Sequence, residues 1–209
     1  MNEDYYSYIN RFFEKWAPVY DFTDLFISGV RWKTVDFTDA KIGSRVLDVC
    51  TGTGKQAFAF ARKGYDVTGI DLSENMLKVA KKNNIYRNVR FETADAANMP
   101  FNNSSFDISC ISFALHEMPL TIREKVLNEM VRVTKPKGTI IIVDYALPVN
   151  KISRFLVYHF VKLYESKYYP EFIKSEPEMS LRKLGIKTKE VLPVLHGVGK
   201  ILKVTNKNI

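Results

Sequence analysis

Short apolar runs alternate with helix-like segments over residues 45–146. The apolar runs are rich in β-branched residues, which favour strands. The segments between them carry apolar residues at helical spacing, and the clearest stripe comprises Ile122, Val126, Leu127, Met130 and Val133. This alternation predicts an open, mostly parallel sheet with helices on both faces, which is an α/β fold.

The pattern sets approximate bounds for each element. Strands are expected over Arg45–Cys50, Asp66–Asp71, Val89–Thr93, Phe106–Phe113 and Thr139–Tyr145. Helices are expected over Gln56–Lys63, Glu74–Asn84 and Ile122–Val133. Lys135 to Gly138 should end the last of these helices. Two more strands, Lys189–Leu195 and Lys200–Thr205, flank a glycine-containing turn and predict an antiparallel hairpin.

Two aromatic segments lie outside this alternating region. The first has bulky residues at helical spacing near the N-terminus: Tyr5, Ile9, Phe12, Phe13 and Trp16. The second, from Ile152 to Tyr169, mixes aromatic residues with lysines. Each is interpreted as a lid over a bound ligand or as plain core, and the second also as a membrane or partner contact. We therefore expect one domain, with a helical lid over residues 1–44, a ligand-binding core over 45–147, and a second lid with the final strands over 148–209.

Length and composition agree with one soluble domain. The chain has 209 residues, of which 46% are hydrophobic and 26% charged, as is ordinary for a globular protein. The first residues form no basic and apolar leader, and no run of about 18 apolar residues occurs, so a cytoplasmic location is expected. Cys50 and Cys110 lie in apolar strands and are expected to be buried reduced thiols. No Cys/His cluster has metal-ligand spacing, so no metal site is expected.

The formal net charge of +8 comes from the C-terminal third of the chain. From Lys151 onward there are 12 basic and 5 acidic residues. A basic surface can bind nucleic acid or anionic lipid, but it can equally be a solvated lysine-rich face. Because no recognition module is appended, nucleic acid is a disfavoured partner, whereas a peripheral membrane contact stays open.

The most specific motif lies where the first strand ends. This strand contains Asp48 and runs into the turn Cys50-Thr51-Gly52-Thr53-Gly54. The glycines can adopt backbone conformations closed to other residues, and the next helix presents free N–H groups to a ligand. The spacing Gly52-x-Gly54-x-x-Ala57 also fits the dinucleotide fingerprint. Whether or not the turn binds a dinucleotide, its backbone predicts a nucleotide-like ligand.

Asp48 distinguishes a dinucleotide ligand from a nucleotide-like ligand without a pyrophosphate. Its carboxylate would repel a pyrophosphate, whereas it would attract an ammonium or a sulfonium group. S-adenosylmethionine carries both cations and no phosphate. The second strand likewise closes on an acid, Asp71, which is placed to accept hydrogen bonds from both ribose hydroxyls, and Ser73 should cap the next helix. An NAD-dependent oxidoreductase is the competing interpretation.

The order of these motifs resembles that of the class I S-adenosylmethionine-dependent methyltransferases. The resemblance runs from about Arg45 to Thr205. It rests on short sequence motifs that follow one another in the same order: Asp48 to Gly54, Asp71, Thr93 to Ala96, Phe106-Asp107, Ser112 to Glu117, and Leu127 to Gly138. It implies a Rossmann-like, mostly parallel seven-stranded sheet that ends in an antiparallel hairpin. It also implies S-adenosyl-L-methionine as the cofactor and methyl transfer as the reaction.

A narrower resemblance lies upstream of the first strand. Tyr20 to Lys33 is similar to the segment preceding the cofactor strand in ubiquinone and menaquinone biosynthesis C-methyltransferases. It implies a small lipophilic or aromatic acceptor, with quinone-like C-methylation as one option. The chain departs from that family at Lys55, where an acid is usual, and at His116-Glu117, where Arg-Asn is usual. N- or O-methylation of another small molecule, an RNA substrate and a non-catalytic cofactor-binding role therefore stay open.

The resemblance also places the site residues. Cofactor contacts of the family fall on Thr53, Asp71, Asp95 with Ala96, and Ser112. With the motif neighbours, the predicted cofactor site comprises Asp48, Cys50, Thr51, Gly52, Thr53, Gly54, Asp71, Leu72, Met76, Asp95, Ala96 and Ser112. The predicted acceptor pocket comprises Tyr20, Trp32, Phe113 and His116.

His116 is the predicted general base. It follows the fourth strand, at the sheet edge where open α/β sheets bind ligands, and an imidazole titrates near neutral pH. We expect His116, oriented by Glu117, to take a hydroxyl proton from the acceptor. The alternative is a histidine that only shapes the pocket. The methyl group of a sulfonium is already activated, so transfer needs mainly alignment and exclusion of water.

Overall fold

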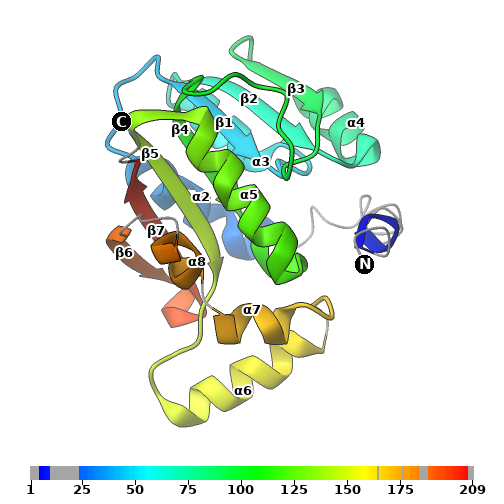
Figure 1. The fold of residues 1–209 in the computed structure, drawn as a ribbon, viewed down its shortest axis with the longest axis vertical. Coiled ribbons are helices and arrows are strands. Elements are labelled where there is room, and N and C mark those ends of the chain that lie inside the picture. Colours follow the sequence, from blue (N-terminus) through cyan, green and yellow to red (C-terminus); the bar gives the residue numbers. More distant parts are fainter. Residues whose placement is uncertain (1–4, 10–23, 164, 176, 184–187, 207–209) are drawn as a thin grey trace.

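One seven-stranded sheet organises the molecule, in the order β3-β2-β1-β4-β5-β7-β6 (Figure 1). The structure is a computed structural model that describes residues 5–9, 24–163, 165–175, 177–183 and 188–206. The parallel strands are β1 (Arg45–Val49), β2 (Asp66–Asp71), β3 (Val89–Thr93), β4 (Phe106–Ser112) and β5 (Thr134–Tyr145). Strand β7 (Gly199–Thr205) lies antiparallel between β5 and β6 (Thr188–Val194). The predicted fold class, including the C-terminal antiparallel strands, is confirmed.

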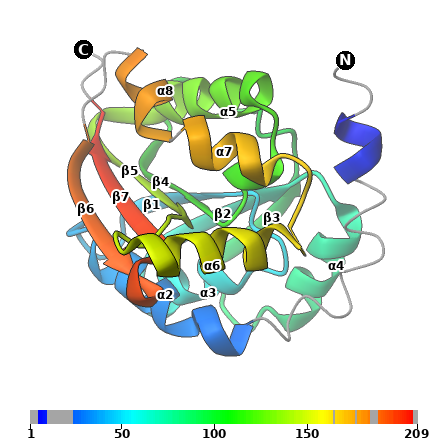
Figure 2. The ribbon, with the colours of Figure 1, turned by 90° about the horizontal axis from the view of Figure 1, so that it is seen from below.

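Helices cover both faces of the sheet (Figure 2). One face is covered by α2 (Asp24–Asp36), α3 (Lys55–Arg62) and α4 (Glu74–Asn83). The other face is covered by α5 (Leu120–Val133), beside which lie α7 (Tyr169–Ser175) and α8 (Pro177–Lys183). Helix α6 (Lys151–Lys162) lies at the end of the molecule near α7, and residues 5–9 form a short helix. No helix of the described ranges is both long and apolar enough to cross a membrane.

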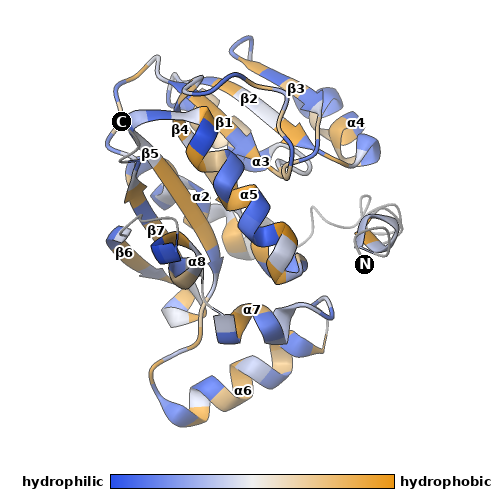
Figure 3. Ribbon diagram, in the orientation of Figure 1, coloured by the Kyte–Doolittle hydropathy of each residue, from blue (hydrophilic) through white to orange (hydrophobic). Residues whose placement is uncertain are grey.

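The sheet separates two hydrophobic cores, because successive side chains of a strand point to opposite faces. Leu47 and Val49 of β1 pack on the α5 side, whereas Val46 packs on the α3 side. All five apolar residues of the predicted α5 stripe are buried. In Figure 3, β5 is hydrophobic along much of its length, while α5 carries hydrophilic residues on its outer side. The helical spacing read from the sequence is therefore the spacing that fills the core.

Most predicted bounds agree with the structure to within two residues, and the start of β5 differs more. Strand β5 begins at Thr134, directly after α5, rather than at Thr139. Its register to β4 shifts between Phe106 and Ile108, and the buried Thr134 hydroxyl bonds the Ser109 hydroxyl over 2.7 Å. The aromatic segment over 152–169 is not one helix, because α6 ends at Lys162 and α7 begins at Tyr169.

Gly69 marks a close approach between β2, β3 and the turn after β1. A Cβ at this position would lie 2.7 Å from the Phe91 ring and 2.8 Å from the Thr51 hydroxyl oxygen. Only a residue without a side chain therefore allows Phe91 and the turn to pack on β2.

We expect Gly69→Ala to lower the free energy of unfolding by about 1–3 kcal/mol, because its Cβ overlaps Phe91 and Thr51. The control is Gly29→Ala in α2, where a Cβ meets no atom within 4 Å. Helix propensity predicts that this control gains about 0.5–1 kcal/mol. Urea unfolding followed by circular dichroism measures both variants. Equal stabilities would contradict the close approach at Gly69.

Candidate functional site

A cavity that opens to solvent lies at the carboxyl ends of β1, β2 and β4. Strand order reverses between β1 and β4, and this switch point is where open α/β sheets bind ligands. Eleven of the twelve predicted cofactor residues line the cavity: Asp48, Cys50, Thr51, Gly52, Thr53, Asp71, Leu72, Met76, Asp95, Ala96 and Ser112. The twelfth, Gly54, lies behind the wall as the N-cap of α3, with φ +83°.

The turn after β1 folds around the carboxylate of Asp48. This side chain is only 1% exposed, and it accepts a 2.6 Å hydrogen bond from the Thr51 hydroxyl. Burial raises the pKa of Asp48 to about 7, although the Thr51 hydrogen bond and the charge of Arg31 act against this rise. Near neutral pH the Asp48 carboxyl is therefore only partly ionised, and a cation entering the cavity would favour its ionised form.

Cys50 differs from its prediction as a buried thiol. It is only partly buried and lines the cavity, whereas Cys110 is fully buried in β4. The φ of Cys50 is +55°, a left-handed conformation that turns the chain out of β1. Burial and the carboxylates of Asp71 and Asp48 raise the pKa of the Cys50 thiol, so it is a neutral wall residue.

Asp71 connects the end of β2 to the turn after β1. One carboxylate oxygen accepts the Gly52 N–H at 2.8 Å, and the other accepts the Ser73 N–H at 2.8 Å. Each oxygen has a second lone pair and can accept a further hydrogen bond from a ligand. Ser73 caps α4 as predicted, since its hydroxyl accepts the Met76 N–H at 3.3 Å.

The N-terminal helix over residues 5–9 closes one wall of the cavity. Tyr5, Tyr6 and Ile9 line it, and Tyr5 and Ile9 also pack into the α5-side core. The Tyr6 hydroxyl donates a 2.8 Å hydrogen bond to Asp95. These residues thus belong to the core and to the cavity wall, and the lid that closes over a bound ligand stays a prediction. Tyr6 was not predicted, while Phe12, Phe13 and Trp16 lie outside the described residues.

The predicted acceptor pocket is only partly assembled in the structure. Phe113 lines the cavity, and Tyr20 lies outside the described residues. Trp32 is 38% exposed, and its ring lies 5.1 Å from the Arg62 guanidinium rather than in the cavity, so its predicted place is wrong.

The expected second lid does not cover the cavity. No described α6 residue lines it, and α6 instead exposes large apolar side chains, namely Ile152, Phe155, Leu156 and Phe160. Only Val161 of α6 is buried. The chain returns toward the site after α6, at Glu165.

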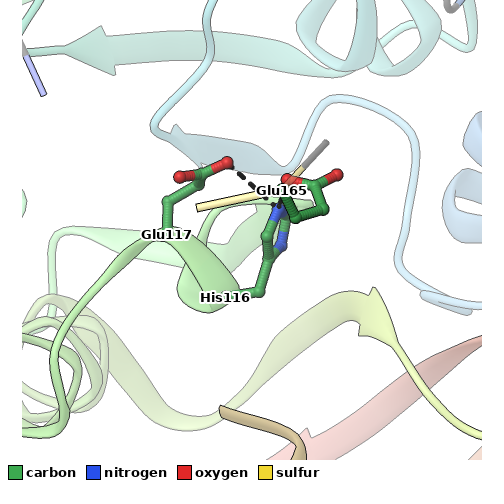
Figure 4. A group of neighbouring side chains, drawn as sticks. All are labelled: His116, Glu117 and Glu165. Carbon is green, nitrogen blue, oxygen red and sulfur yellow. Dashed lines mark hydrogen bonds and ion pairs between the residues drawn. The ribbon is translucent and has the colours of Figure 1, made fainter. Parts of the chain in front are cut away.

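His116 lies behind the cavity wall with both ring nitrogens close to carboxylates, and Figure 4 draws the two glutamates that face Nε2. Nδ1 is 2.7 Å from Asp144 Oδ1, while Nε2 is 3.1 Å from Glu165 Oε2 and 3.4 Å from Glu117 Oε1. Burial alone would lower the pKa of His116, but these carboxylates hold it well above its usual range. Because both ring nitrogens face carboxylates and the residue does not line the cavity, the geometry does not support His116 as a base or as a residue of the acceptor wall.

Glu117 is the member of this group that lines the cavity. Burial raises its pKa, and the neighbouring His116 opposes that rise. Its Oε2 has no hydrogen-bond partner in the part of the chain that the structure describes. For Glu165, hydrogen bonds from His116 and from the Tyr145 hydroxyl outweigh burial and lower the pKa to about 2.

Arg123 fixes the turn that carries His116 and Glu117, and no pattern in the sequence predicted this role. The side chain is fully buried in α5, with its guanidinium 5.0 Å from the centre of the Phe172 ring. It donates hydrogen bonds to the carbonyls of Leu115 at 3.2 Å and Met118 at 2.8 Å. These two carbonyls flank the turn, so Arg123 positions it from behind.

Comparison with known proteins gives a consistent result. The methyltransferase domain family matches residues 46–138. The demethylmenaquinone methyltransferase of Paenarthrobacter aurescens is 40% identical over 149 residues, which are 69% of this chain and 57% of that protein. The demethylmenaquinone methyltransferase of Listeria welshimeri is 34% identical over 188 residues, which are 80% of this chain and 78% of that protein.

A solved structure shows the same fold at lower sequence similarity. An S-adenosylmethionine-dependent methyltransferase of Aquifex aeolicus superposes with a TM-score of 0.67 and 21% identity, over 84% of this chain and 88% of that one. The chain spans less than two thirds of the length of several of the curated relatives, 57% in the Paenarthrobacter protein and 58% in a relative from Renibacterium salmoninarum.

We expect Arg123→Met to lower the free energy of unfolding by about 1–3 kcal/mol, because the buried Met118 carbonyl loses its donor, whereas the Leu115 carbonyl keeps the Met118 N–H at 3.2 Å. Lys125→Met, at an exposed position of the same helix, should change stability by less than about 0.5 kcal/mol. Chemical denaturation measures both variants. A stability change in Arg123→Met as small as that of Lys125→Met would show that the guanidinium does not hold the turn.

Proposed function

Because this chain belongs to the S-adenosylmethionine-dependent methyltransferases related to the ubiquinone and menaquinone biosynthesis C-methyltransferases, we propose that it methylates a small lipophilic or aromatic acceptor, with quinone-like C-methylation as the first candidate. The observation that carries this proposal is the division of the cavity. The end at β1 and β2 is acidic, with Asp48, Asp71 and Asp95. The end at α5 is apolar, with Met118, Ile122 and Val126.

We infer the placement of the cofactor from the acidic end. Asp71 would accept the ribose hydroxyls, Asp95 with Ala96 would flank the adenine, and Asp48 would face the cationic part of the donor. Ser112 and Met76 complete this wall. The support is the convergence of these side chains from β1, β2, β4 and the intervening loops on one cavity.

For methyl transfer the protein mainly has to align the acceptor nucleophile with the methyl carbon and the sulfur atom. When bound, S-adenosylmethionine would supply a methyl group on a sulfonium. A carbon nucleophile of the acceptor would take this methyl group as the carbon–sulfur bond breaks, and the neutral thioether S-adenosylhomocysteine would leave with the electron pair. The acceptor would then release to solvent the proton that the methyl group replaces. The helix over residues 5–9 and the buried walls limit water beside the sulfonium. The polar group of the acceptor would point toward Glu117, and His116 would act as a positioning residue for Glu117.

A transfer assay tests the acceptor. We expect the protein to transfer labelled methyl groups from S-adenosylmethionine to a short-chain reduced demethylmenaquinone, because the hydroquinone ring provides the carbon nucleophile. Asp71→Ala should reduce transfer at least about a hundredfold, because its carboxylate shapes the turn and meets the ribose. Mass spectrometry of the product locates the methyl group. Transfer to an amine or to RNA, with none to the hydroquinone, would refute C-methylation of a quinone precursor.

The pH dependence of cofactor binding tests the place of Asp48. In the free protein this carboxyl has a pKa raised to about 7, so it is largely protonated below that pH. A bound cation lowers the pKa, so binding must release a proton, and the Kd should fall up to about tenfold per pH unit between about pH 5.5 and about pH 7. Calorimetry in two buffers of different ionisation enthalpy measures the proton release directly. The same release in Asp48→Asn would assign it to another group.

A further inference from the structure

Three side chains from two turns of the chain converge behind the acceptor end of the cavity (Figure 4). His116 and Glu117 come from the turn after β4, and Glu165 comes from the turn after α6. One ligand atom of each residue lies within 4.8 Å of the ligand atoms of the other two. Their polar ends point toward one another in the close-up view.

The spacing of these atoms fits a shared metal ion. Imidazole nitrogens and carboxylate oxygens bind zinc and similar ions at about 2.0–2.2 Å, so two ligands at octahedral or tetrahedral angles lie about 3.0–3.4 Å apart. Nε2 of His116 is 3.1 Å from the Glu165 oxygen and 3.4 Å from the Glu117 oxygen. Both separations are those of atoms that bind one ion.

The surroundings hold the ligands in the required orientation. Asp144, which is itself buried, lies 2.7 Å from Nδ1 of His116 and turns Nε2 toward the two glutamates. The Tyr145 hydroxyl donates a 2.7 Å hydrogen bond to the second oxygen of Glu165. A carboxylate on the far nitrogen of a histidine and hydrogen bonds to the ligating carboxylates are the usual supports of metal ligands.

One carboxylate oxygen of this group has no partner in the described structure. Oε2 of Glu117 is buried without a hydrogen bond, and the side chain as a whole is 9% exposed. Three carboxylates, those of Glu117, Asp144 and Glu165, face a single imidazole. Buried charges of one sign are stabilised by a counter-ion or by coordination of a metal. The cluster is therefore short of positive charge.

We propose that His116, Glu117 and Glu165 bind one divalent transition-metal ion. The ion would replace the proton that Nε2 of His116 carries in the metal-free protein, and this proton would pass to solvent. One imidazole nitrogen and two carboxylate oxygens suit manganese, iron, cobalt or zinc, whereas magnesium and calcium prefer all-oxygen sites. Because Glu117 lines the cavity, the ion would lie beside the acceptor end and could hold an oxygen of the acceptor. This last consequence rests on the proposed function, whereas metal binding itself does not.

A titration of metal-free protein tests the site without cofactor or acceptor. After dialysis against a chelator, we expect Co²⁺, Mn²⁺ and Zn²⁺ to bind in a ratio of one ion per chain, and bound Co²⁺ to show visible absorption bands of a nitrogen and oxygen site. Magnesium should bind at least about tenfold more weakly than manganese. The absence of stoichiometric binding and of the cobalt spectrum in the wild-type protein would overturn the proposal. Such a failure would leave the methyltransferase assay unaffected.

Variants assign the ligands. Glu117→Gln and Glu165→Gln should each raise the Kd for Mn²⁺ at least about tenfold, because each removes a charged oxygen ligand. Glu92→Gln, on the edge strand β3 and separated from β4 by β2 and β1, is the matched control and should leave the Kd unchanged. Circular dichroism checks that each variant folds. Unchanged binding in both glutamate variants would place the ion elsewhere.

Discussion

The hydrogen bonds from Gly52 and Ser73 to Asp71 hold the functional end of this fold together. Strands β1 and β2 are neighbours, so the turn that leaves β1 passes over the end of β2. The Asp71 carboxylate accepts one N–H from each side of that junction, at 2.8 Å in both cases. A charged acceptor makes these bonds stronger than ordinary amide bonds. The same side chain therefore connects the turn to the end of β2 and lines the cavity.

Glycine makes this junction sterically possible. Gly69 leaves room in β2 for the Phe91 ring and the Thr51 side chain, and Gly54 leaves room for Phe91 and Phe58 at the start of α3. The turn can thus lie flat on the sheet, with Thr51 close enough to donate to the buried Asp48. The raised pKa of Asp48 follows from this packing, since burial removes the water that would stabilise its charge. The close packing of the sheet therefore causes the raised pKa of Asp48, whose side chain lines the cavity.

The strands and the cofactor end of the site could be predicted because their determinants are local in the sequence. Asp48 and the glycines after it lie within one turn, and Asp71 closes the next strand, so strand order alone brings them to one edge. The misses depend on distant packing. Trp32 was assigned to the pocket, but α2 turns it toward Arg62. Arg123 lies beside the apolar stripe of α5, and only the fold shows that its guanidinium meets the carbonyls of the turn after β4.

The cluster around His116 shows most clearly that contacts between distant segments cannot be predicted from the sequence. His116 and Glu117 are adjacent in the sequence, which led to a simple base with an orienting acid. The structure adds Asp144 from the end of β5 and Glu165 from beyond α6, and these two carboxylates change the chemistry of the imidazole. Its nitrogens are no longer available to a substrate, because each already faces a carboxylate. Glu117 then remains as the group of this cluster that reaches the cavity. The charge arrangement at this end of the cavity is thus built from three separate segments, rather than from the His-Glu pair that the sequence displays.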